Sequence, residues 1–204
     1  MAKTIITIGR QFGSNGRNIG RKLAEKISAN FYDKELINET AKESGLSEEF
    51  LKSLDEKSTR SFLYSLVSDP YSYGFTSAGY QTNLNQQAFQ ATYDTIKKLA
   101  DKGPSVFVGR CADYALRHNT NLVRIFIHAP LEERIKNVSE RFNLTPDKAK
   151  AQIVKEDKAR ASYYNYYTSK KWGALESYDI FINSSLMSED DTVDFIIDYI
   201  DKIK

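Results

Sequence analysis

The sequence predicts an α/β fold in which a parallel sheet of about five strands is covered by helices on both faces. Two patterns carry this prediction. Short apolar runs with little alternation recur along the chain, as in strands whose two faces are both covered. Segments with apolar residues three or four positions apart fill the intervals between these runs, as in amphipathic helices. The length of 204 residues suits one domain with one core.

Five apolar segments are the expected strands, and the one near residue 30 is the shortest. They are residues 4–8, 30–32, 105–108, 122–127 and 178–182. Turn residues or helical patterns follow each of them, so consecutive strands are expected to pair in parallel through helical crossovers.

Helical periodicity follows the first strand and the fourth strand, and it returns at the end of the chain. The residues that carry it are Ile19, Leu23, Ala24 and Ile27; Leu131, Ile135, Val138 and Phe142; and Val193, Ile196, Ile197 and Ile200. Helix starts are indicated by Pro130, by Thr145 before Pro146, and by Ser188 with Asp191 three residues later.

Residues 33–103 lack a strong strand pattern and are expected to form a helical insertion. Helices are expected within it at 47–54 and 86–99. Residues 68–84, which are rich in Ser, Tyr, Gly and Thr, are expected to be its mobile loop.

Composition excludes several classes of protein. No apolar run approaches the roughly 18 residues of a membrane helix, and the N-terminus has no signal-peptide pattern. A net charge of +2 gives no reason to expect a nucleic-acid partner. One cysteine, Cys111, allows no internal disulfide or zinc cluster, and a small buried hydrophobe suits it better than a reactive thiolate. We expect a cytoplasmic protein.

A glycine-rich turn joins the first strand to the first helix. Gly13 and Gly16 bracket it, and a helix that begins near Arg17 would aim backbone N–H groups at an anion. The nucleotide-kinase pattern has Lys followed by Ser or Thr after the second glycine, whereas Arg17 and Asn18 stand here. Phosphate binding is the leading interpretation, and a turn that needs glycine only for packing is the alternative.

Two further charged residues follow predicted strands. Arg110 comes after 105–108 and Asp33 after 30–32, and ligands of parallel sheets gather at the carboxyl ends of the strands. Arg110 and Arg17 would then face one crevice and suit two phosphate groups. Asp33 could hold Mg²⁺ through water, bind a sugar hydroxyl, or serve only as a helix N-cap.

Three other features leave alternatives open. Asp157 and Arg160, one helical turn apart, could act on a ligand or form a surface ion pair. Tyrosines 163, 164, 166 and 167 could cover something planar or only pack helices. His118 and His128 have no partner at metal-ligand spacing, so we assign them no chemistry.

Taken in order, several motifs resemble the cytidylate kinase-like family, a divergent branch of the P-loop nucleoside monophosphate kinases, and the match runs nearly end to end. They are Gly13-Ser14-Asn15-Gly16-Arg17, Phe31-Tyr32-Asp33-Lys34-Glu35-Leu36-Ile37, Val108-Gly109-Arg110, Ala129-Pro130-Leu131-Glu132-Glu133-Arg134, Asp157-Lys158-Ala159-Arg160-Ala161-Ser162-Tyr163-Tyr164 and Tyr178-Asp179-Ile180-Phe181-Ile182-Asn183-Ser184.

The resemblance implies a three-layer P-loop fold over residues 1–204, with the insertion 33–103 as acceptor-binding region and a helical lid at 143–176. It also implies ATP, Mg²⁺ and small-molecule nucleotides as ligands. The implied donor-phosphate and ATP residues are Gly13, Ser14, Asn15, Gly16, Arg17 and Asn18 in the loop, with Asn183 and Ser184 against the donor base. The implied catalytic residues are Arg17, Arg110, Arg134, Asp157 and Arg160; Arg110 and Asp33 would bind the acceptor, and Asp33 the metal.

The chain departs from true cytidylate kinases at several positions. Asn18 replaces the hydroxyl that normally binds Mg²⁺, and Glu39 stands where those enzymes have an arginine. The leading hypothesis is ATP-dependent phosphoryl transfer to a nucleoside monophosphate, CMP-like or dCMP-like, or to a similar small acceptor. The alternatives are a nucleotide-binding protein with little or no turnover, and kinase chemistry on a metabolite that is not a nucleotide.

Overall fold

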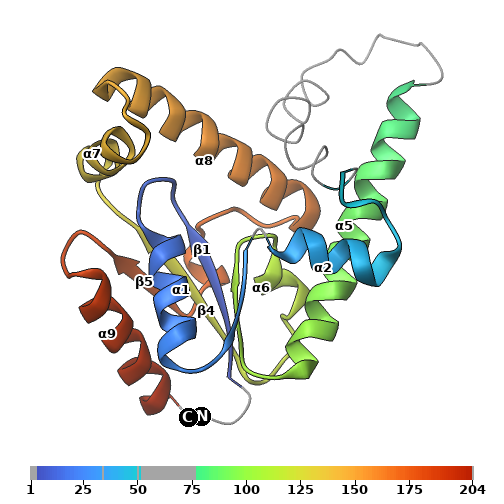
Figure 1. Ribbon diagram of the computed structural model, residues 1–204, viewed down its shortest axis with the longest axis horizontal. Helices are drawn as coiled ribbons and strands as arrows, with labels where there is room; N and C mark the ends of the chain where they lie inside the picture. The colour runs from blue at the N-terminus through green and yellow to red at the C-terminus, as the bar shows by residue number, and fades with distance from the viewer. Residues whose placement is uncertain (1–3, 34, 50, 52–76, 204) are drawn as a thin grey trace.

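The computed structural model describes residues 4–33, 35–49, 51 and 77–203 (Figure 1). A five-stranded sheet forms its centre, with the strand order β2-β3-β1-β4-β5. Neighbouring strands of this sheet pair in parallel, and Ile8 of the central strand lies beside Val108 and Ile125. The predicted α/β class with five parallel strands is therefore confirmed. The strands are β1 (Ile5–Arg10), β2 (Asn30–Tyr32), β3 (Ser105–Val108), β4 (Leu122–His128) and β5 (Ile180–Asn183).

Two strand predictions were wrong by two residues at one end, whereas the other strand ends differ by at most one residue. β1 runs on through Arg10, because Gly9 and Arg10 continue the ladder with Phe126 and Ile127 of β4. β5 begins only at Ile180, where its ladder with Ile125 of β4 begins, and the 3₁₀ turn η1 (Leu175–Ser177) lies before it. Both strand ends depend on pairing with segments that are distant in the sequence, and a local apolar run does not predict such pairing.

Three helices begin where Pro130, Thr145 before Pro146, and Ser188 indicated. The side chain of Ser188 caps the last helix by accepting a hydrogen bond from the backbone N–H of Asp191 at 3.1 Å. Pro146 opens the long helix that follows Thr145. The helices are α1 (Gly16–Lys26), α2 (Glu35–Ser44), α5 (Ser77–Lys102), α6 (Ala112–Ala115), α7 (Leu131–Phe142), α8 (Pro146–Thr168) and α9 (Glu189–Lys202).

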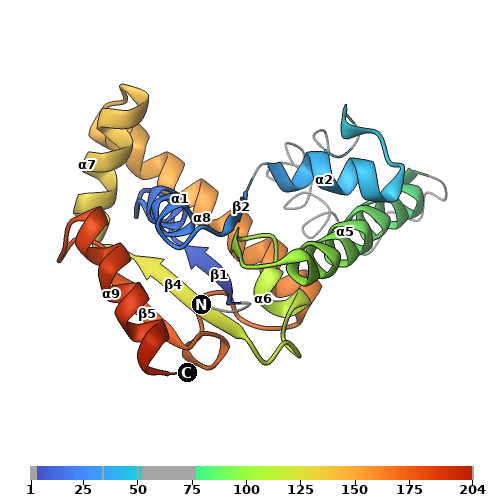
Figure 2. The ribbon, with the colours of Figure 1, turned by 60° about the horizontal axis from the view of Figure 1, so that its bottom comes forward.

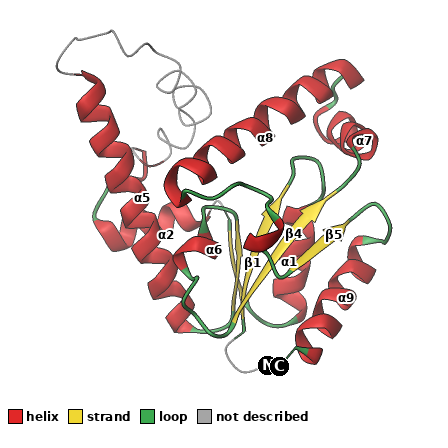
Figure 3. Ribbon diagram, turned by 180° about the vertical axis from the view of Figure 1, so that it is seen from behind, coloured by secondary structure: helices red, strands yellow, loops and turns green. Residues whose placement is uncertain are grey.

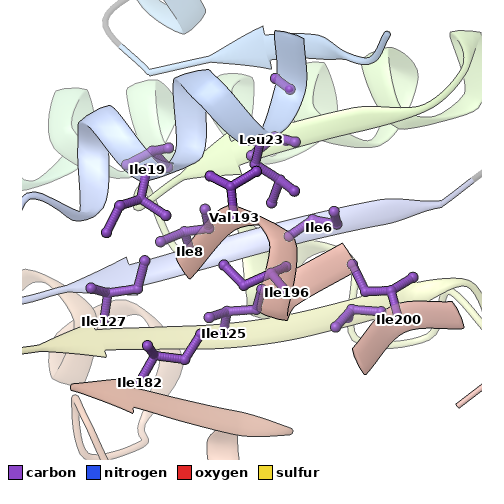
Figure 4. Packing of buried hydrophobic residues seen from close by; sticks show 14 residues of the cluster. Ile6, Ile8, Ile19, Leu23, Ile125, Ile127, Ile182, Val193, Ile196 and Ile200 are labelled. Carbon is purple, nitrogen blue, oxygen red and sulfur yellow. The ribbon is translucent and has the colours of Figure 1, made fainter. Parts of the chain in front are cut away.

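Helices cover both faces of the sheet, as Figure 2 shows. On one face, α1 and α9 bury a cluster of aliphatic side chains against β1, β3, β4 and β5. In Figure 4, Ile6 and Ile8 of β1 lie between Ile19 of α1 and Ile196 of α9. On the other face, a second cluster joins Ile5 and Phe107 of the sheet to α5 and α6. Burial on both faces explains why the strands lack polar alternation.

Most of the described residues of the insertion are helical. α2 packs along α5, and the predicted helix 86–99 lies within α5. Of the predicted helix 47–54, residues 48, 49 and 51 are helical, and 50 and 52–54 lie outside the described residues. The predicted loop 68–84 was wrong from Ser77 onward, because α5 already begins there; residues 68–76 lie outside the described residues. A composition typical of loops is only weak evidence for a loop, because the packing of a long helix can override it.

α8 crosses above the carboxyl ends of the strands, as Figures 1 and 3 both show. It packs against α7, and residues of α8 line a cavity together with the ends of β1 and β3. This edge of the sheet is therefore covered by a helix rather than open. Among the described helices, we find none that is long and apolar enough to span a membrane.

Candidate functional site

The loop between β1 and α1 is shaped by left-handed backbone. Gly13 has φ +83°, and a Cβ there would lie 2.9 Å from the carbonyl oxygen of Arg134, so this position requires glycine. Asn15, the N-cap of α1, has φ 56°, and its side chain makes no capping hydrogen bond. The first turn of α1 therefore offers backbone N–H groups to an anion, as at known phosphate sites.

Two serine side chains fix this loop to the sheet. Ser14 Oγ donates to the carbonyl oxygens of Gln11 at 2.9 Å and Ile127 at 3.2 Å. Ser184 Oγ contacts the carbonyl oxygens of Ser14 at 2.8 Å and His128 at 3.1 Å. The loop is thus held by side chains from both ends of the chain.

A buried ion pair holds the same loop from the other side. Arg134 Nη1 donates to Asp157 Oδ2 at 2.5 Å and to the carbonyl oxygen of Phe12 at 3.3 Å. The other carboxylate oxygen, Asp157 Oδ1, accepts the backbone N–H of Phe12 at 2.7 Å. Arg134 and Asp157 come from α7 and α8, so both helices are tied to the phosphate loop.

The turn after β3 is strained in a way that points a charged side chain toward the loop. Gly109, Arg110 and Cys111 have φ values of 76°, 57° and 55° in succession. Left-handed backbone costs a residue with a side chain about 1–2 kcal/mol. Strain of this kind gathers at functional sites, where the surrounding structure maintains it. Here it places Arg110 in the lining of the cavity under α8.

Asp33 lies between two arginines. Its Oδ2 accepts from Arg17 Nε at 2.5 Å, and its Oδ1 lies 3.7 Å from Arg10 Nη2. The carboxylate is buried, with 6 % of the residue exposed, whereas the side chain of Arg17 is 42 % exposed. Asp33 therefore forms ion pairs with two guanidinium groups beside the loop.

These groups surround one cavity of about 660 Å³. Among the residues that the structure describes, five arginines line it against three acidic residues. This excess of fixed positive charge beside the first turn of α1 favours a ligand with more than one anionic group. The charged lining residues are Arg10, Arg17, Arg110, Arg141 and Arg160, and Asp33, Asp113 and Glu156.

Arg10 is the most perturbed of these cations. Burial lowers its pKa, and the neighbouring charge of Arg160 lowers it further, to about 9, against the opposing effect of Asp33. Burial likewise lowers the pKa of Arg160, whose Nη1 donates to the carbonyl oxygen of Arg10 at 3.0 Å. Both groups remain charged at neutral pH, so an incoming anion would relieve their mutual repulsion.

The structure brings together only part of the predicted site. Of the residues expected to bind phosphate or acceptor, seven line the cavity: Gly13, Asn15, Gly16, Arg17, Asp33, Arg110 and Arg160. Ser14, Ser184, Arg134 and Asp157 instead hold the loop, as described above. Asn18 Nδ2 lies 3.4 Å from Glu189 Oε1, and Asn183 Oδ1 accepts from the backbone of Ser185 at 3.1 Å.

Sequence reasoning missed several lining residues, above all Arg10 and Asp113. A charge at the carboxyl end of the buried first strand could have indicated Arg10, because ligands gather at that edge. Asp113 follows Arg110 by three residues, but an acidic residue in a short helix normally suggests only helix capping. Arg141 and Glu156, which come from α7 and α8, gave no local signal.

The residues present suit phosphate better than they suit direct metal binding. Among the described residues, no group of three or more His, Cys, Asp or Glu side chains could hold a metal ion. The carboxylate of Asp33 is already engaged by arginines. Mg²⁺ keeps several waters and commonly binds through phosphates with one or two carboxylates, so a metal would have to arrive with the phosphates.

Comparison with known sequences gives one family over most of the chain. The model of the cytidylate kinase-like family matches residues 5–186. A cytidylate kinase from Staphylothermus marinus is 24% identical over 199 residues, which cover 97% of this chain and 97% of that protein. The match to a cytidylate kinase from Sulfolobus acidocaldarius is 29% identical but covers 43% of this chain and about half, 48%, of that protein.

Solved structures agree on the fold. An uncharacterized protein from Eubacterium ventriosum superposes with a TM-score of 0.72 and 31% identity, over 97% of this chain and 98% of its own. Shikimate kinase from Bacteroides thetaiotaomicron superposes with a TM-score of 0.56 and 10% identity, over 97% and 98% of the two chains. At this identity the second likeness concerns the fold alone, which is that of a P-loop kinase.

Proposed function

The chain belongs to the cytidylate kinase-like family, and we propose that it transfers the terminal phosphoryl group of ATP to a nucleoside monophosphate of the CMP or dCMP type, or to a similar small acceptor. One observation carries the proposal: Arg10, Arg17, Arg110 and Arg160 line one cavity at the N-terminus of α1. Phosphoryl transfer needs this arrangement, because its transition state spreads negative charge over the oxygens of the transferred group.

Each part of the site has a task in this reaction. The loop 13–17 would hold the donor phosphates through backbone N–H groups, and Arg17 would grip them with its guanidinium group. Arg110, on the strained turn after β3, would bind the phosphate of the acceptor. Arg160 and Arg10, whose charges repel each other, would stabilise the charge between the two ligands.

Arg134 and Asp157 have a supporting task in this proposal. Their bonds to both backbone groups of Phe12 support a positioning role, in which they hold the loop while other groups contact the phosphates. Mg²⁺, when bound, would neutralise phosphate charge, and Asp33 would reach it only through water because arginines occupy its carboxylate.

A single-turnover assay tests the function. The protein is mixed with γ-labelled ATP, Mg²⁺ and one of CMP, dCMP, UMP or AMP, and transfer of the label is followed. Transfer to CMP or dCMP supports the proposal, and intact ATP with every acceptor overturns it. Arg17→Ala should abolish ATP binding in a titration, whereas Arg21→Ala, at an exposed position on the same helix, should leave it unchanged.

The second candidate function is a nucleotide-binding protein with little or no turnover. Asn18 favours it, since this residue replaces the usual hydroxyl ligand of Mg²⁺ and its amide lies toward Glu189. The same assay separates the two candidates. A protein of this second kind would bind ATP, and binding would raise its melting temperature. It would nevertheless leave the label on ATP with every acceptor.

A further inference from the structure

We infer that Asp113 determines acceptor specificity by accepting a hydrogen bond from a hydroxyl or amino group of the acceptor molecule. The inference rests on the proposed function, because it takes an acceptor to be bound in the cavity, and it adds which chemical group of that acceptor is recognised. Asp113 lies on α6, three residues after Arg110, and lines the same cavity.

The cavity extends from the arginines onto one face of the sheet. Ile6 and Ile8 of β1 face α1 and α9, so Thr7 and Gly9 face the opposite side. Aromatic and hydroxyl-bearing side chains lie among the lining residues around Asp113. The lining residues there are Thr7, Gly9, Cys111, Asp113, Tyr164, Trp172 and Tyr178.

The carboxylate of Asp113 is held in one orientation. Its Oδ2 accepts a hydrogen bond from Tyr164 Oη at 2.6 Å. Tyr164 is itself fixed, since it is 5% exposed and packs in a cluster with Phe89 and Cys111. The backbone N–H groups of Asp113 and Tyr114 also donate to this carboxylate. A carboxylate has about four lone-pair positions, so these bonds orient the group and leave it able to accept another.

Two observations indicate that hydrogen-bonding capacity remains unused in this part of the cavity. Burial raises the pKa of Asp113 in spite of the bonds from Tyr164 and from the backbone N–H groups of Asp113 and Tyr114, which means that the ionised carboxylate is incompletely compensated here. Thr7 is 3% exposed, and within the described part of the chain its hydroxyl has no hydrogen-bond partner. A ligand that carries hydroxyl or amino groups could satisfy both residues.

The charges of the lining residues determine which part of the acceptor lies beside Asp113. A phosphate would be repelled by Asp113 and attracted by the arginines, so the uncharged body of the acceptor belongs beside Asp113. Arg110 lies only three residues away, on the turn that leads into α6. One segment would then bind the acceptor twice, by its phosphate through Arg110 and by its polar body through Asp113.

Calorimetric titration of the full-length protein tests this role with Asp113→Asn. Asparagine keeps the shape and can still accept the bond from Tyr164, but it presents an amide N–H₂ where the second carboxylate oxygen was. We expect the variant to bind its preferred mononucleotide at least tenfold more weakly and to bind ATP with an affinity within twofold of the wild type. Asp198→Asn, at an exposed position on α9, is the matched control and should change neither affinity.

Ligands that lack one group identify what Asp113 recognises. dCMP lacks the 2′-hydroxyl of CMP, and UMP lacks its 4-amino group. Removing the ligand group that Asp113 contacts should weaken binding to the wild type about tenfold. The same removal should weaken binding to Asp113→Asn far less. Tyr164→Phe should reduce in part this ratio of affinities for the two ligands, because the carboxylate of Asp113 loses the hydrogen bond that orients it. If Asp113 served folding alone, Asp113→Asn would have a lower melting temperature and the same ratio of affinities as the wild type. This result would overturn the inference.

Failure of the inference is distinguishable from failure of the proposed function. If the wild type binds a mononucleotide and Asp113→Asn binds the same series equally well, the inference alone is wrong. If the wild type binds ATP and no mononucleotide of the panel, the proposed acceptor class is wrong, and the assignment of Asp113 fails with it.

Discussion

Arg134 and Asp157 form an ion pair that holds both backbone groups of Phe12. The pair closes at 2.5 Å between Nη1 and Oδ2, the carboxylate accepts the N–H of Phe12, and the guanidinium donates to its carbonyl oxygen. The side chains are 10% and 18% exposed. The two helices that cover the site are therefore joined to the loop expected to bind phosphate, so movement of α8 away from the sheet would release that loop.

Asp157→Ala is expected to lower the free energy of unfolding by about 3 kcal/mol, because it leaves the charge of Arg134 buried without its partner. The N–H of Phe12 loses its acceptor as well. Urea unfolding measures the change. ATP affinity should also fall, since the loop is no longer held.

A matched control removes an exposed carboxylate that also pairs with a cation. Asp190 is 78% exposed and lies 2.9 Å from Lys22. Asp190→Ala should cost less than about 1 kcal/mol and leave ATP affinity unchanged. If Asp157→Ala lost turnover while unfolding like the wild type, Asp157 would belong to the chemistry and the positioning role would be wrong.

Gly109→Ala is expected to weaken ligand binding through Arg10. Gly109 has φ +76°, and a methyl group there would collide with Nη1 of Arg10, which Asp33 holds in place. We expect a loss of about 1–2 kcal/mol in the free energy of unfolding and a clear loss of ATP or acceptor affinity in calorimetry.

Gly45→Ala separates the two effects of Gly109→Ala. Gly45 has a similar φ of +72°, and a Cβ there would have nothing within 4 Å. It should therefore cost a similar free energy of unfolding and leave binding unchanged. Equal affinities for both variants would mean that Arg10 does not contact the ligand.

Local patterns predicted the fold well because they follow from local physics. The strand at Asn30–Tyr32 and the strand at Ser105–Val108 have the predicted bounds, and the serine cap at Ser188 is present. The rule that ligands gather at the carboxyl ends of parallel strands also placed Arg17 and Arg110 beside one cavity.

The rest of the site depends on contacts between distant segments. Phe12 and Asp157 are 145 positions apart, and no spacing rule reports that their backbone and side chain meet. Arg10 was missed because the first strand was expected to stop at residue 8, before β4 was known to extend its ladder. Asp113 was missed because its partner, Tyr164, lies on a helix 51 residues later.

Arg10→Met is expected to separate stability from binding. Burial and the neighbouring arginines lower the pKa of Arg10, so its charge destabilises the ligand-free fold. The variant should melt at the same temperature as the wild type or higher, and ATP affinity should fall at least tenfold. Arg21→Met, whose side chain is 49% exposed on α1, should alter neither quantity. A large drop in melting temperature would show that Arg10 serves the fold.

Asp179→Asn is expected to show how acid destabilises the protein. Burial alone would raise the pKa of Asp179, but hydrogen bonds from Arg124 lower it instead. Arg124 Nη2 donates to Asp179 Oδ1 at 2.6 Å, and the backbone N–H of Arg124 donates to Oδ2 at 2.8 Å. A carboxylate whose pKa is lower in the folded state than its value of about 3.9 when unfolded stabilises the fold above that pH. This contribution is lost as the pH falls through the folded pKa. In urea unfolding, the deficit of the variant should be full at pH 6 and shrink below about pH 4. Asp198→Asn should unfold like the wild type throughout, and a deficit of Asp179→Asn that grew on acidification would contradict the assignment.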